Sequence, residues 1–112
     1  MVVRKAYVPE LGDIVWIDFD PTKGHEQKGR RPAIVLSSKI YNEPSRLFVV
    51  CPVSSQVKGY PYEVVLTGKL RGVVLVDHVR SLDWGARTVK KAGVVSEDTL
   101  VEIQKKLKTL LF

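Results

Sequence analysis

Ile14-Val15-Trp16-Ile17-Asp18-Phe19 is the most telling stretch for the architecture of this chain. Gly12 opens it, Asp20-Pro21 closes it, and its β-branched and aromatic side chains are those that strands favour. It is too short for a helix and has the length of an ordinary strand. We therefore interpret it as the first strand of a mainly β domain.

Similar apolar runs follow along the chain, separated by glycine, proline, asparagine and serine. They occupy residues 33–36, 47–53, 62–66 and 73–76. We expect residues 41–44 to form a turn before the third run, and a turn through residues 68–72 to join the last two. Short strands at this spacing are typical of a small all-β barrel or sandwich.

The end of the chain has a different periodicity. Ser96 is a suitable N-cap, and Glu97 and Asp98 would lie in the first turn, where the helix dipole favours acids. The apolar residues then follow at helical spacing: Leu100, Ile103, Leu107, Leu110 and Leu111. We expect an amphipathic helix that covers an open edge or mouth of the barrel and keeps its lysines in solvent.

Length and composition limit the possible classes of protein. The chain has 112 residues, enough for a single domain spanning residues 1–112. Its hydrophobic fraction of 45% excludes intrinsic disorder, and no apolar run is long enough to span a membrane. Lys and Arg number 18 against 12 Asp and Glu, a net charge of +6 that points toward an anionic partner, with nucleic acid first.

The number of cysteines and the absence of metal-binding spacings exclude several kinds of site. The one cysteine, Cys51, excludes an internal disulfide and a Cys-rich zinc site, and its apolar neighbours predict a buried, unreactive thiol. No secretory leader precedes the first strand, so we expect a cytoplasmic protein. No histidine or carboxylate cluster has metal-ligand spacing and no phosphate loop opens a helix, so we predict neither a metal nor another cofactor.

The most informative loop is Pro21-Thr22-Lys23-Gly24-His25-Glu26-Gln27-Lys28-Gly29-Arg30-Arg31-Pro32. Long polar connections of this kind are often functional in small domains. Arg31 directly precedes Pro32 and the second strand, so the sheet would position a guanidinium able to clamp a phosphate. The same residues also fit a surface ion pair of Glu26 with Lys28 or Arg30.

Two further polar clusters lie at strand ends. Residues 54–62 combine hydroxyls, an amide, a lysine and two tyrosines, which suits single-stranded nucleic acid but also an ordinary turn with Lys58 and Gly59 at its tip. Residues 77–84 follow the fifth apolar run and include His78, either a general acid or base or simply a hydrogen-bonding group. We interpret Trp16 and Trp84 as core or dimer-interface aromatics.

Together these clusters resemble the MazF/PemK family of bacterial toxin endoribonucleases. The matching segments cover nearly the whole chain: residues 12–21, Gly24-His25-Glu26-Gln27, Gly29-Arg30-Arg31-Pro32-Ala33, Tyr41-Asn42, residues 58–64 and residues 72–77. The most specific part is the pattern Gly-x-Glu-Gln-x-Gly-x-Arg-Pro.

The resemblance implies a fold and an activity. The fold is a mainly β (α+β) structure, a small SH3-like β-barrel with a C-terminal α-helix, assembled as a homodimer. The activity is metal-independent cleavage of single-stranded RNA, mostly messenger RNA, at short motifs. Cleavage leaves a 2′,3′-cyclic phosphate and a free 5′-hydroxyl. The partner is an antitoxin whose disordered, acidic tail lies across the RNA groove.

By motif position, Arg31 carries the family's catalytic arginine and Glu26 a glutamate important in part of the family. Ser54 stands where the family usually has threonine. Serine keeps the hydroxyl but loses the methyl group that restricts its rotamer, so we expect retained activity with looser positioning. Because a guanidinium stays protonated, Arg31 would stabilise the phosphorane or donate toward the leaving oxygen, and Glu26 would be the base. Ser55 could take the place of Ser54 if the register slips by one, although strand alternation would turn it to the other face.

The remaining candidate residues would contact RNA through charge, hydrogen bonds or stacking. They are Arg30, Lys28, Gln56, Lys58, Asp77, Arg80 and Tyr41. Two alternatives remain open: a gyrase poison of the same fold, which traps a topoisomerase complex without cleavage, and an inactive relative that only binds RNA or an acidic tail. Discrete RNA fragments formed in EDTA would distinguish the nuclease from both.

Overall fold

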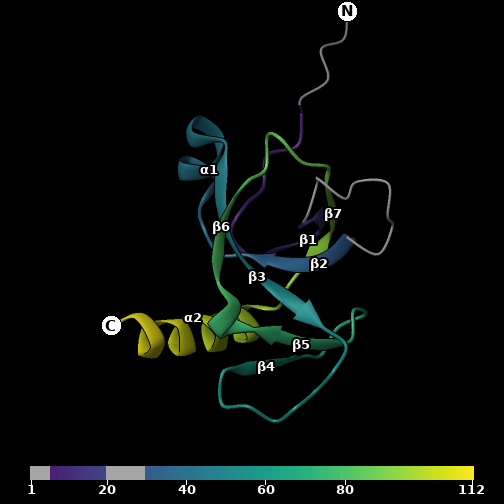
Figure 1. Ribbon diagram of the computed structural model, residues 1–112, viewed down its shortest axis with the longest axis vertical. Helices are drawn as coiled ribbons and strands as arrows, with labels where there is room; N and C mark the ends of the chain where they lie inside the picture. The colour runs from purple at the N-terminus through teal and green to yellow at the C-terminus, as the bar shows by residue number, and fades with distance from the viewer. Residues whose placement is uncertain (1–5, 20–29) are drawn as a thin grey trace, which may run out of the picture.

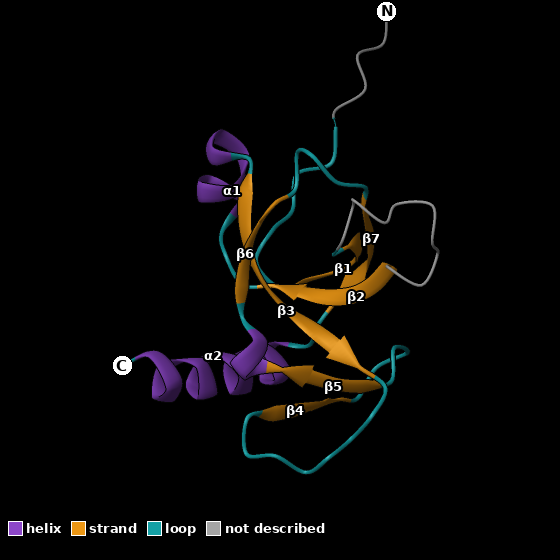
Figure 2. Cartoon of the chain, viewed as in Figure 1, coloured by secondary structure: helices purple, strands orange, loops and turns teal. Residues whose placement is uncertain are grey.

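The computed structural model describes residues 6–19 and 30–112. Figures 1 and 2 show a strongly curved β-sheet with one long helix across its lower part and a short helix at its upper end. The elements in chain order are β1 (Asp13–Asp18), β2 (Arg30–Val35), α1 (Lys39–Ser45), β3 (Leu47–Ser54), β4 (Glu63–Leu66), β5 (Gly72–Leu75), the 3₁₀ turn η3 (Val76–His78), β6 (Arg80–Asp83), β7 (Val89–Val94) and α2 (Glu97–Leu111).

All strand pairs are antiparallel, and the hydrogen-bonded order is β4-β5-β3-β2-β1-β7, with β6 paired to β3. The mainly β fold with a C-terminal helix is therefore confirmed. Within residues 6–19 and 30–112, β4 and β7 each pair on one side only, so the sheet is not hydrogen-bonded into the closed barrel that we expected.

Strands β2 and β3 lie at the centre of the sheet, and their alternating side chains feed two apolar clusters. Val35 of β2 and Phe48 of β3 point into the first cluster, where they meet Trp84. Ile34 of β2 and Cys51 of β3 point into the second, which Ile103 of α2 completes. Both strands are therefore buried on both faces, which makes them rigid supports for the residues at their ends.

Helix α2 begins where its sequence predicts. The Ser96 hydroxyl accepts a hydrogen bond from the Thr99 amide at 3.2 Å, as an N-cap does. The helix packs against β4 and η3, and Lys106 Nζ donates to the Glu63 carbonyl at 2.9 Å. The helix therefore lies against the end strand β4, and its Ile103 closes the second apolar cluster on one face of the sheet. No helix in the described part of the chain is long and apolar enough to cross a membrane.

The predicted turn at residues 41–44 is wrong, because these residues belong to helix α1. The Ser38 hydroxyl accepts a hydrogen bond from the Ile40 amide and starts the helix. The Asn42 side chain is fully buried and donates to the Pro9 and Ser37 carbonyls, both at 2.9 Å. Asparagine usually favours turns, but here tertiary hydrogen bonds satisfy its side-chain amide, and a helix can form.

Two strands have no counterpart in the sequence-based interpretation. Strand β6 occupies part of the polar cluster 77–84, and β7 is a largely exposed end strand containing Lys90, Lys91 and Gly93. Neither has the apolar alternation that identifies a strand. Only Leu82 of β6 is buried in the first apolar cluster, and pairing with β3 and β1 holds the rest of the two strands in place. The strands that were predicted agree with the structure to within a few residues.

Cys51 is completely buried, as predicted. Burial, helped by the negative charge of Asp77, raises the pKa of its thiol to about 12. The thiol is therefore protonated at neutral pH and has a packing role.

Candidate active site

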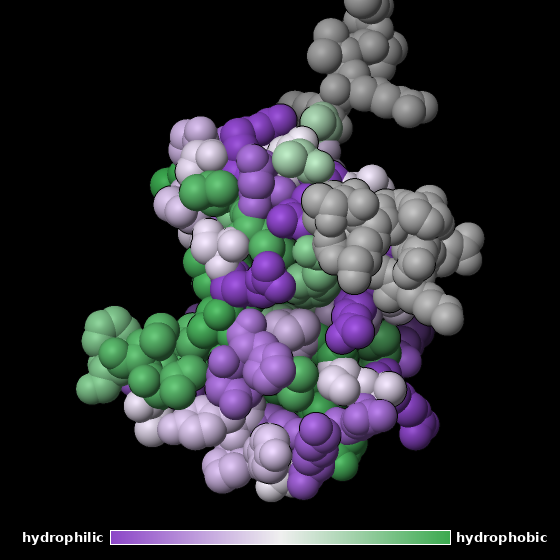
Figure 3. Space-filling model, in the orientation of Figure 1, coloured by the Kyte–Doolittle hydropathy of each residue, from purple (hydrophilic) through white to green (hydrophobic). Residues whose placement is uncertain are grey.

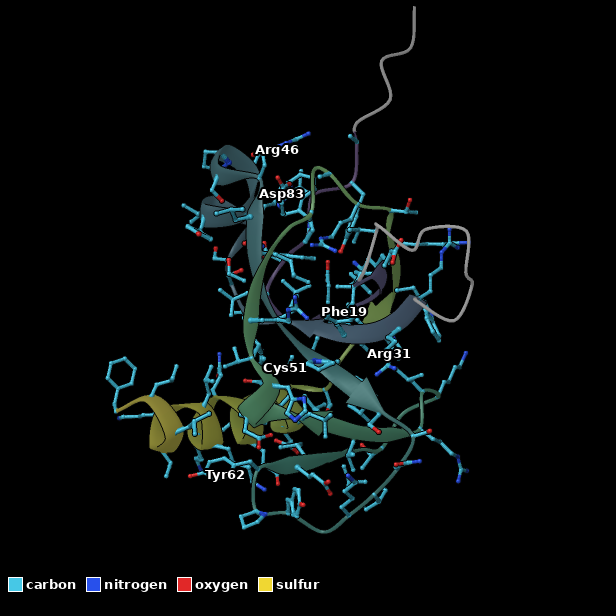
Figure 4. The ribbon with its side chains drawn as sticks, viewed as in Figure 1. Phe19, Arg31, Arg46, Cys51, Tyr62 and Asp83 are labelled. Carbon is cyan, nitrogen blue, oxygen red and sulfur yellow. The ribbon has the colours of Figure 1, made fainter. Side chains whose placement is uncertain are left out.

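A pocket of about 510 Å³ lies beside the start of β2, the end of β3 and the turn between β4 and β5. Figure 4 shows Arg31 on β2, above the end of β3. The lining residues come from four separate segments of the chain: Trp16, Arg31, Pro32, Val53, Ser54, Ser55, Gln56, Leu70 and Arg71. The volume is within the range of small-molecule sites.

Arg31 is positioned by the sheet, as its sequence position predicts. It pairs with Ile17 of β1, and the next residue, Pro32, pairs with Trp16. The Arg31 side chain is exposed, and its guanidinium has no hydrogen-bond or ion-pair partner among the residues that the structure describes. It therefore presents free donors and a positive charge to the pocket, where a phosphate would find them.

Ser54 is the last residue of β3 and pairs with Val73 of β5. Its hydroxyl oxygen accepts a hydrogen bond from the Gln56 amide at 3.1 Å. An acceptor for the hydroxyl proton is absent from the described part of the chain, so that proton can be donated to a ligand in the pocket. The arrangement orients the Ser54 hydroxyl as a donor.

The neighbouring backbone leaves no room for a side chain beside Ser54. Gly72 has a φ of +139°, and a Cβ atom there would clash with the Ser54 carbonyl oxygen. Glycine is therefore required at this position for both conformation and space. Gly72 lets β5 approach β3 closely where the predicted catalytic hydroxyl is held.

Ser55 and Gln56 also line the pocket. Strand alternation does not decide the direction of Ser55, because β3 ends at Ser54. Gln56, predicted to contact RNA, is exposed at the pocket with its amide side chain available.

Four predicted RNA-contacting residues, Arg80, Lys58, Arg30 and Asp77, do not line the pocket. The Arg80 guanidinium stacks on the Phe19 ring, 5.5 Å from its centroid. Lys58 is held through its backbone amide, which donates to the buried Glu63 carboxylate at 3.1 Å. Arg30 faces Asp18 across the β1–β2 pair. The carboxylate of Asp77, the fourth, is 4.0 Å from His78 Nε2 on η3.

Tyr41 is the predicted contact least connected to the pocket. It lies on α1, which Figure 1 places at the upper end of the molecule, away from the end of β3. The predicted site residues Glu26 and Lys28 lie outside the described residues. Thus Arg31, Ser54 and Gln56 share one pocket, whereas Arg30, Lys58, Asp77, Arg80 and Tyr41 do not line it.

Sequence reasoning missed two polar or aromatic members of the pocket. Arg71 belongs to the β4–β5 turn, where a single cation carries no distinguishing signal. Trp16 was assigned to a core or a dimer interface, yet it is 39% exposed and lines the pocket, so the core assignment is wrong. Trp84, in contrast, is 7% exposed and packs in the first apolar cluster, as predicted.

Residues 10–111 match the model of a family described as PemK-like, MazF-like toxin of type II toxin-antitoxin system. The chain belongs to this family. The resemblance found from the sequence is thereby confirmed, and the family covers nearly all of the chain, from before β1 to the end of α2.

Named relatives of this toxin-family chain are endoribonucleases. The chain is 49% identical over 106 residues to the endoribonuclease toxin MazF of Escherichia coli K12, covering 94% of this chain and 96% of that protein. It is 34% identical to the endoribonuclease PemK of Escherichia coli, covering 98% of this chain and 87% of that protein.

Solved structures of the toxin family have the same fold. A crystal structure of MazF from Deinococcus radiodurans matches with a TM-score of 0.85 at 49% identity, covering 95% of this chain and 98% of that chain. A crystal structure of MazE-MazF from the same organism matches with a TM-score of 0.84 at 44% identity, covering 95% of this chain and 97% of that chain.

The toxin-family chain has a second pocket of about 390 Å³ on the other side of the β4–β5 turn. It lies between the end strands β4 and β7 and the start of α2, and its walls include Ile14, Leu66, Leu70 and Val94. Leu70 borders both pockets. In residues 6–19 and 30–112, no three His, Cys, Asp or Glu side chains come together as metal ligands.

Proposed function

We propose that this protein is the toxin of a type II toxin–antitoxin pair and acts as a sequence-specific, metal-independent endoribonuclease on single-stranded messenger RNA in the cytoplasm. One observation carries the proposal: Arg31 and Ser54 line the same pocket in a chain of this toxin family. The names of the relatives support the reaction class.

The proposed reaction is an intramolecular transesterification. The ribose 2′-oxygen forms a bond to the adjacent phosphorus, and the bond from phosphorus to the 5′-oxygen of the next nucleotide breaks. The proton of the 2′-hydroxyl passes to a base, and the departing 5′-oxygen receives a proton. The products are a 2′,3′-cyclic phosphate and a free 5′-hydroxyl. The enzyme must therefore stabilise a phosphorane with extra negative charge.

Arg31 supplies that stabilisation. Its guanidinium has no competing partner within the described residues and can offer two parallel N–H donors to the non-bridging oxygens. Ser54 donates its hydroxyl proton to the same group, because its oxygen is already oriented by the Gln56 amide. The Gln56 amide orients the Ser54 hydroxyl, and strand pairing fixes the backbone of Arg31, so little reorganisation would be needed when the substrate arrives.

Glu26 is the proposed base, by its position in the family motif. A carboxylate can accept the 2′-hydroxyl proton, which a protonated guanidinium cannot. Replacement of Glu26 by glutamine should lower the rate of cleavage and leave RNA affinity largely intact, since glutamine keeps the shape but not the basicity. Cleavage at the wild-type rate would exclude this role.

Cations around the pocket would hold the RNA on either side of the reacting phosphate. Arg30, Lys28, Lys58 and Arg80, with Gln56 and the weaker candidates Asp77 and Tyr41, are the proposed contacts. The net charge of +6 favours any extended anion, so the acidic tail of the antitoxin would compete for the same groove. RNA affinity should therefore fall as salt rises.

The homodimer that the family resemblance implies is also part of the proposal. In the space-filling view, apolar surface gathers at the C-terminal end of α2 (Figure 3). Leu110, Leu111 and Phe112 are exposed there. A second copy that covered this surface would remove it from water, which favours association. Light scattering of the wild type and of a Leu111→Ser variant would test this interface.

The decisive experiment for the activity is cleavage of a long, defined RNA in EDTA. We expect discrete fragments, 5′-hydroxyl ends that a kinase can label directly, and 3′ ends that resist a phosphatase until the cyclic phosphate is opened. Primer extension would give the recognised motif. A gyrase poison would leave the RNA intact and instead trap cleaved DNA on the topoisomerase, and an inactive relative would do neither.

A further inference from the structure

Trp16 is the most unusual residue of β1. The strand alternates between buried and outward-facing side chains, and its largest apolar side chain faces outward with 39% of its surface exposed. The other tryptophan is buried and donates its indole N–H to the Asn42 carbonyl at 2.9 Å. Among the residues that the structure describes, the Trp16 indole N–H has no such acceptor. An exposed indole at a pocket wall is available to a ligand.

The surroundings of Trp16 combine an apolar wall with cations. Pro32 lies directly across from Trp16 on β2 and Lys90 directly across on β7, so the three form one row across the sheet. Pro32 and Leu70 extend the apolar wall of the pocket. Arg31 and Arg71 line the same pocket, so two arginines accompany the apolar wall.

A pocket with both an indole and cations fits a nucleotide better than it fits a phosphate alone or an apolar ligand alone. A phosphate alone needs the cations but gains nothing from an indole, whereas an apolar group gains nothing from two guanidiniums. A nucleobase with its phosphate uses both, because the base stacks on the ring and the phosphate meets the cation. The pocket volume of about 510 Å³ leaves space beyond that of one phosphate group.

We propose that Trp16 is the stacking platform for one base of the RNA substrate, next to the phosphate that Arg31 and Ser54 bind. The proposal rests on the proposed function and adds a base-binding subsite to it. The base on Trp16 belongs to a nucleotide that flanks the cleaved bond. Stacking is tolerant of base identity, so Trp16 supplies affinity and register, and hydrogen-bonding groups such as Gln56 supply discrimination.

The test uses a short oligoribonucleotide that contains the mapped cleavage motif and a single 2′-deoxy sugar at the cleaved nucleotide. This substrate analogue binds but lacks the nucleophile. Its affinity is measured by fluorescence anisotropy for the wild type, Trp16→Phe and Trp16→Leu. We expect Trp16→Leu to weaken binding roughly 5- to 150-fold, the range that loss of one base–aromatic stack gives, and Trp16→Phe to stay within about threefold.

A double-mutant cycle identifies the base. Oligonucleotides with an abasic sugar on either side of the cleaved bond are measured with wild type and Trp16→Leu. At the stacked position, removal of the base should weaken binding strongly for the wild type and hardly at all for Trp16→Leu, because both changes remove the same contact. At the other position, the losses of affinity caused by the abasic sugar and by Trp16→Leu should add. Additive penalties at both positions would overturn the proposal.

Controls separate this proposal from the proposed function and from a structural role. Ile40→Ala truncates an exposed side chain on α1 and should bind as the wild type does. Thermal unfolding and light scattering should be the same for Trp16→Leu and the wild type, and a change in oligomeric state would assign Trp16 to the dimer interface instead. If the wild type cleaves RNA while Trp16→Leu binds and cleaves equally well, only the stacking proposal fails.

Discussion

The two pockets on either side of the β4–β5 turn share their construction but not their chemistry. Strand β1 gives Trp16 to one and Ile14 to the other, on the same face of the strand, and Leu70 borders both. The pocket at the end of β3 adds Arg31, Arg71 and two serine hydroxyls. The pocket between β4 and β7 adds one lysine, Lys69, and otherwise only hydroxyl and apolar groups.

The difference between the two pockets lies in the polar groups that a ligand-binding site needs. An open sheet leaves apolar hollows wherever its end strands do not meet, and these need no function. Convergent cations and an oriented hydroxyl, in contrast, have an electrostatic cost unless an anion joins them. The comparison predicts that changes in the β3 pocket alter RNA cleavage and that changes in the β4–β7 pocket do not.

Arg31→Ala should have the most severe consequence. Loss of the guanidinium removes both a charge and its donors from the phosphorane, so cleavage should slow by at least about 10²- to 10³-fold with the fold unchanged. Single-turnover cleavage and circular dichroism measure the two properties. Lys105→Ala on α2 removes a cation that lines neither of these two pockets and serves as the control. Full activity of Arg31→Ala would refute the assignment of this pocket.

A slightly smaller loss is expected for Ser54→Ala, about 10²-fold in the rate of cleavage, because one donor is lost but no charge. Ser54→Thr should cleave at least as fast as the wild type, since the added methyl group restricts the rotamer and keeps the hydroxyl. Measured under the same single-turnover conditions, an alanine variant as fast as the threonine variant would contradict a role for the hydroxyl.

Gly72→Ala tests whether the backbone beside Ser54 matters. The added methyl group would meet the Ser54 carbonyl in a backbone conformation with φ of +139°, so we expect a loss of about 1–3 kcal/mol in the free energy of unfolding, together with slower cleavage. Gly68→Ala in the same turn is a matched control, because nothing lies within 4 Å of the point that its methyl group would occupy. Urea denaturation compares them, and equal stabilities would disprove the clash.

A change in the β4–β7 pocket should have the least effect of all. Val94 lines this pocket and is largely exposed, so Val94→Ala should change neither the cleavage rate nor RNA affinity by more than about twofold. The assays are those used for Arg31→Ala. A loss comparable to that of Ser54→Ala would mean that this pocket takes part in the reaction and that the contrast between the two pockets is false.

Short stretches of sequence predicted the features that depend on neighbouring residues. β-branched runs indicated the positions of β1 to β5, Ser96 with its following acids indicated the start of α2, and the apolar context of Cys51 indicated its burial. Short stretches of sequence did not predict helix α1 or strand β7. The Asn42 amide is satisfied by carbonyls that only the folded chain brings near, and β7 is held by pairing with β1 instead of by an apolar face.

The toxin family, the mainly β class and the placement of Arg31 at the start of a strand all follow from the amino-acid sequence alone, because motif spacing and strand periodicity act over neighbouring residues. The convergence of Trp16, Arg31, Ser54 and Arg71 on one pocket becomes visible only in the folded chain. Their proximity depends on strand register and on how the sheet curves. These follow from long-range pairing and packing of the whole core, which no short stretch of sequence specifies.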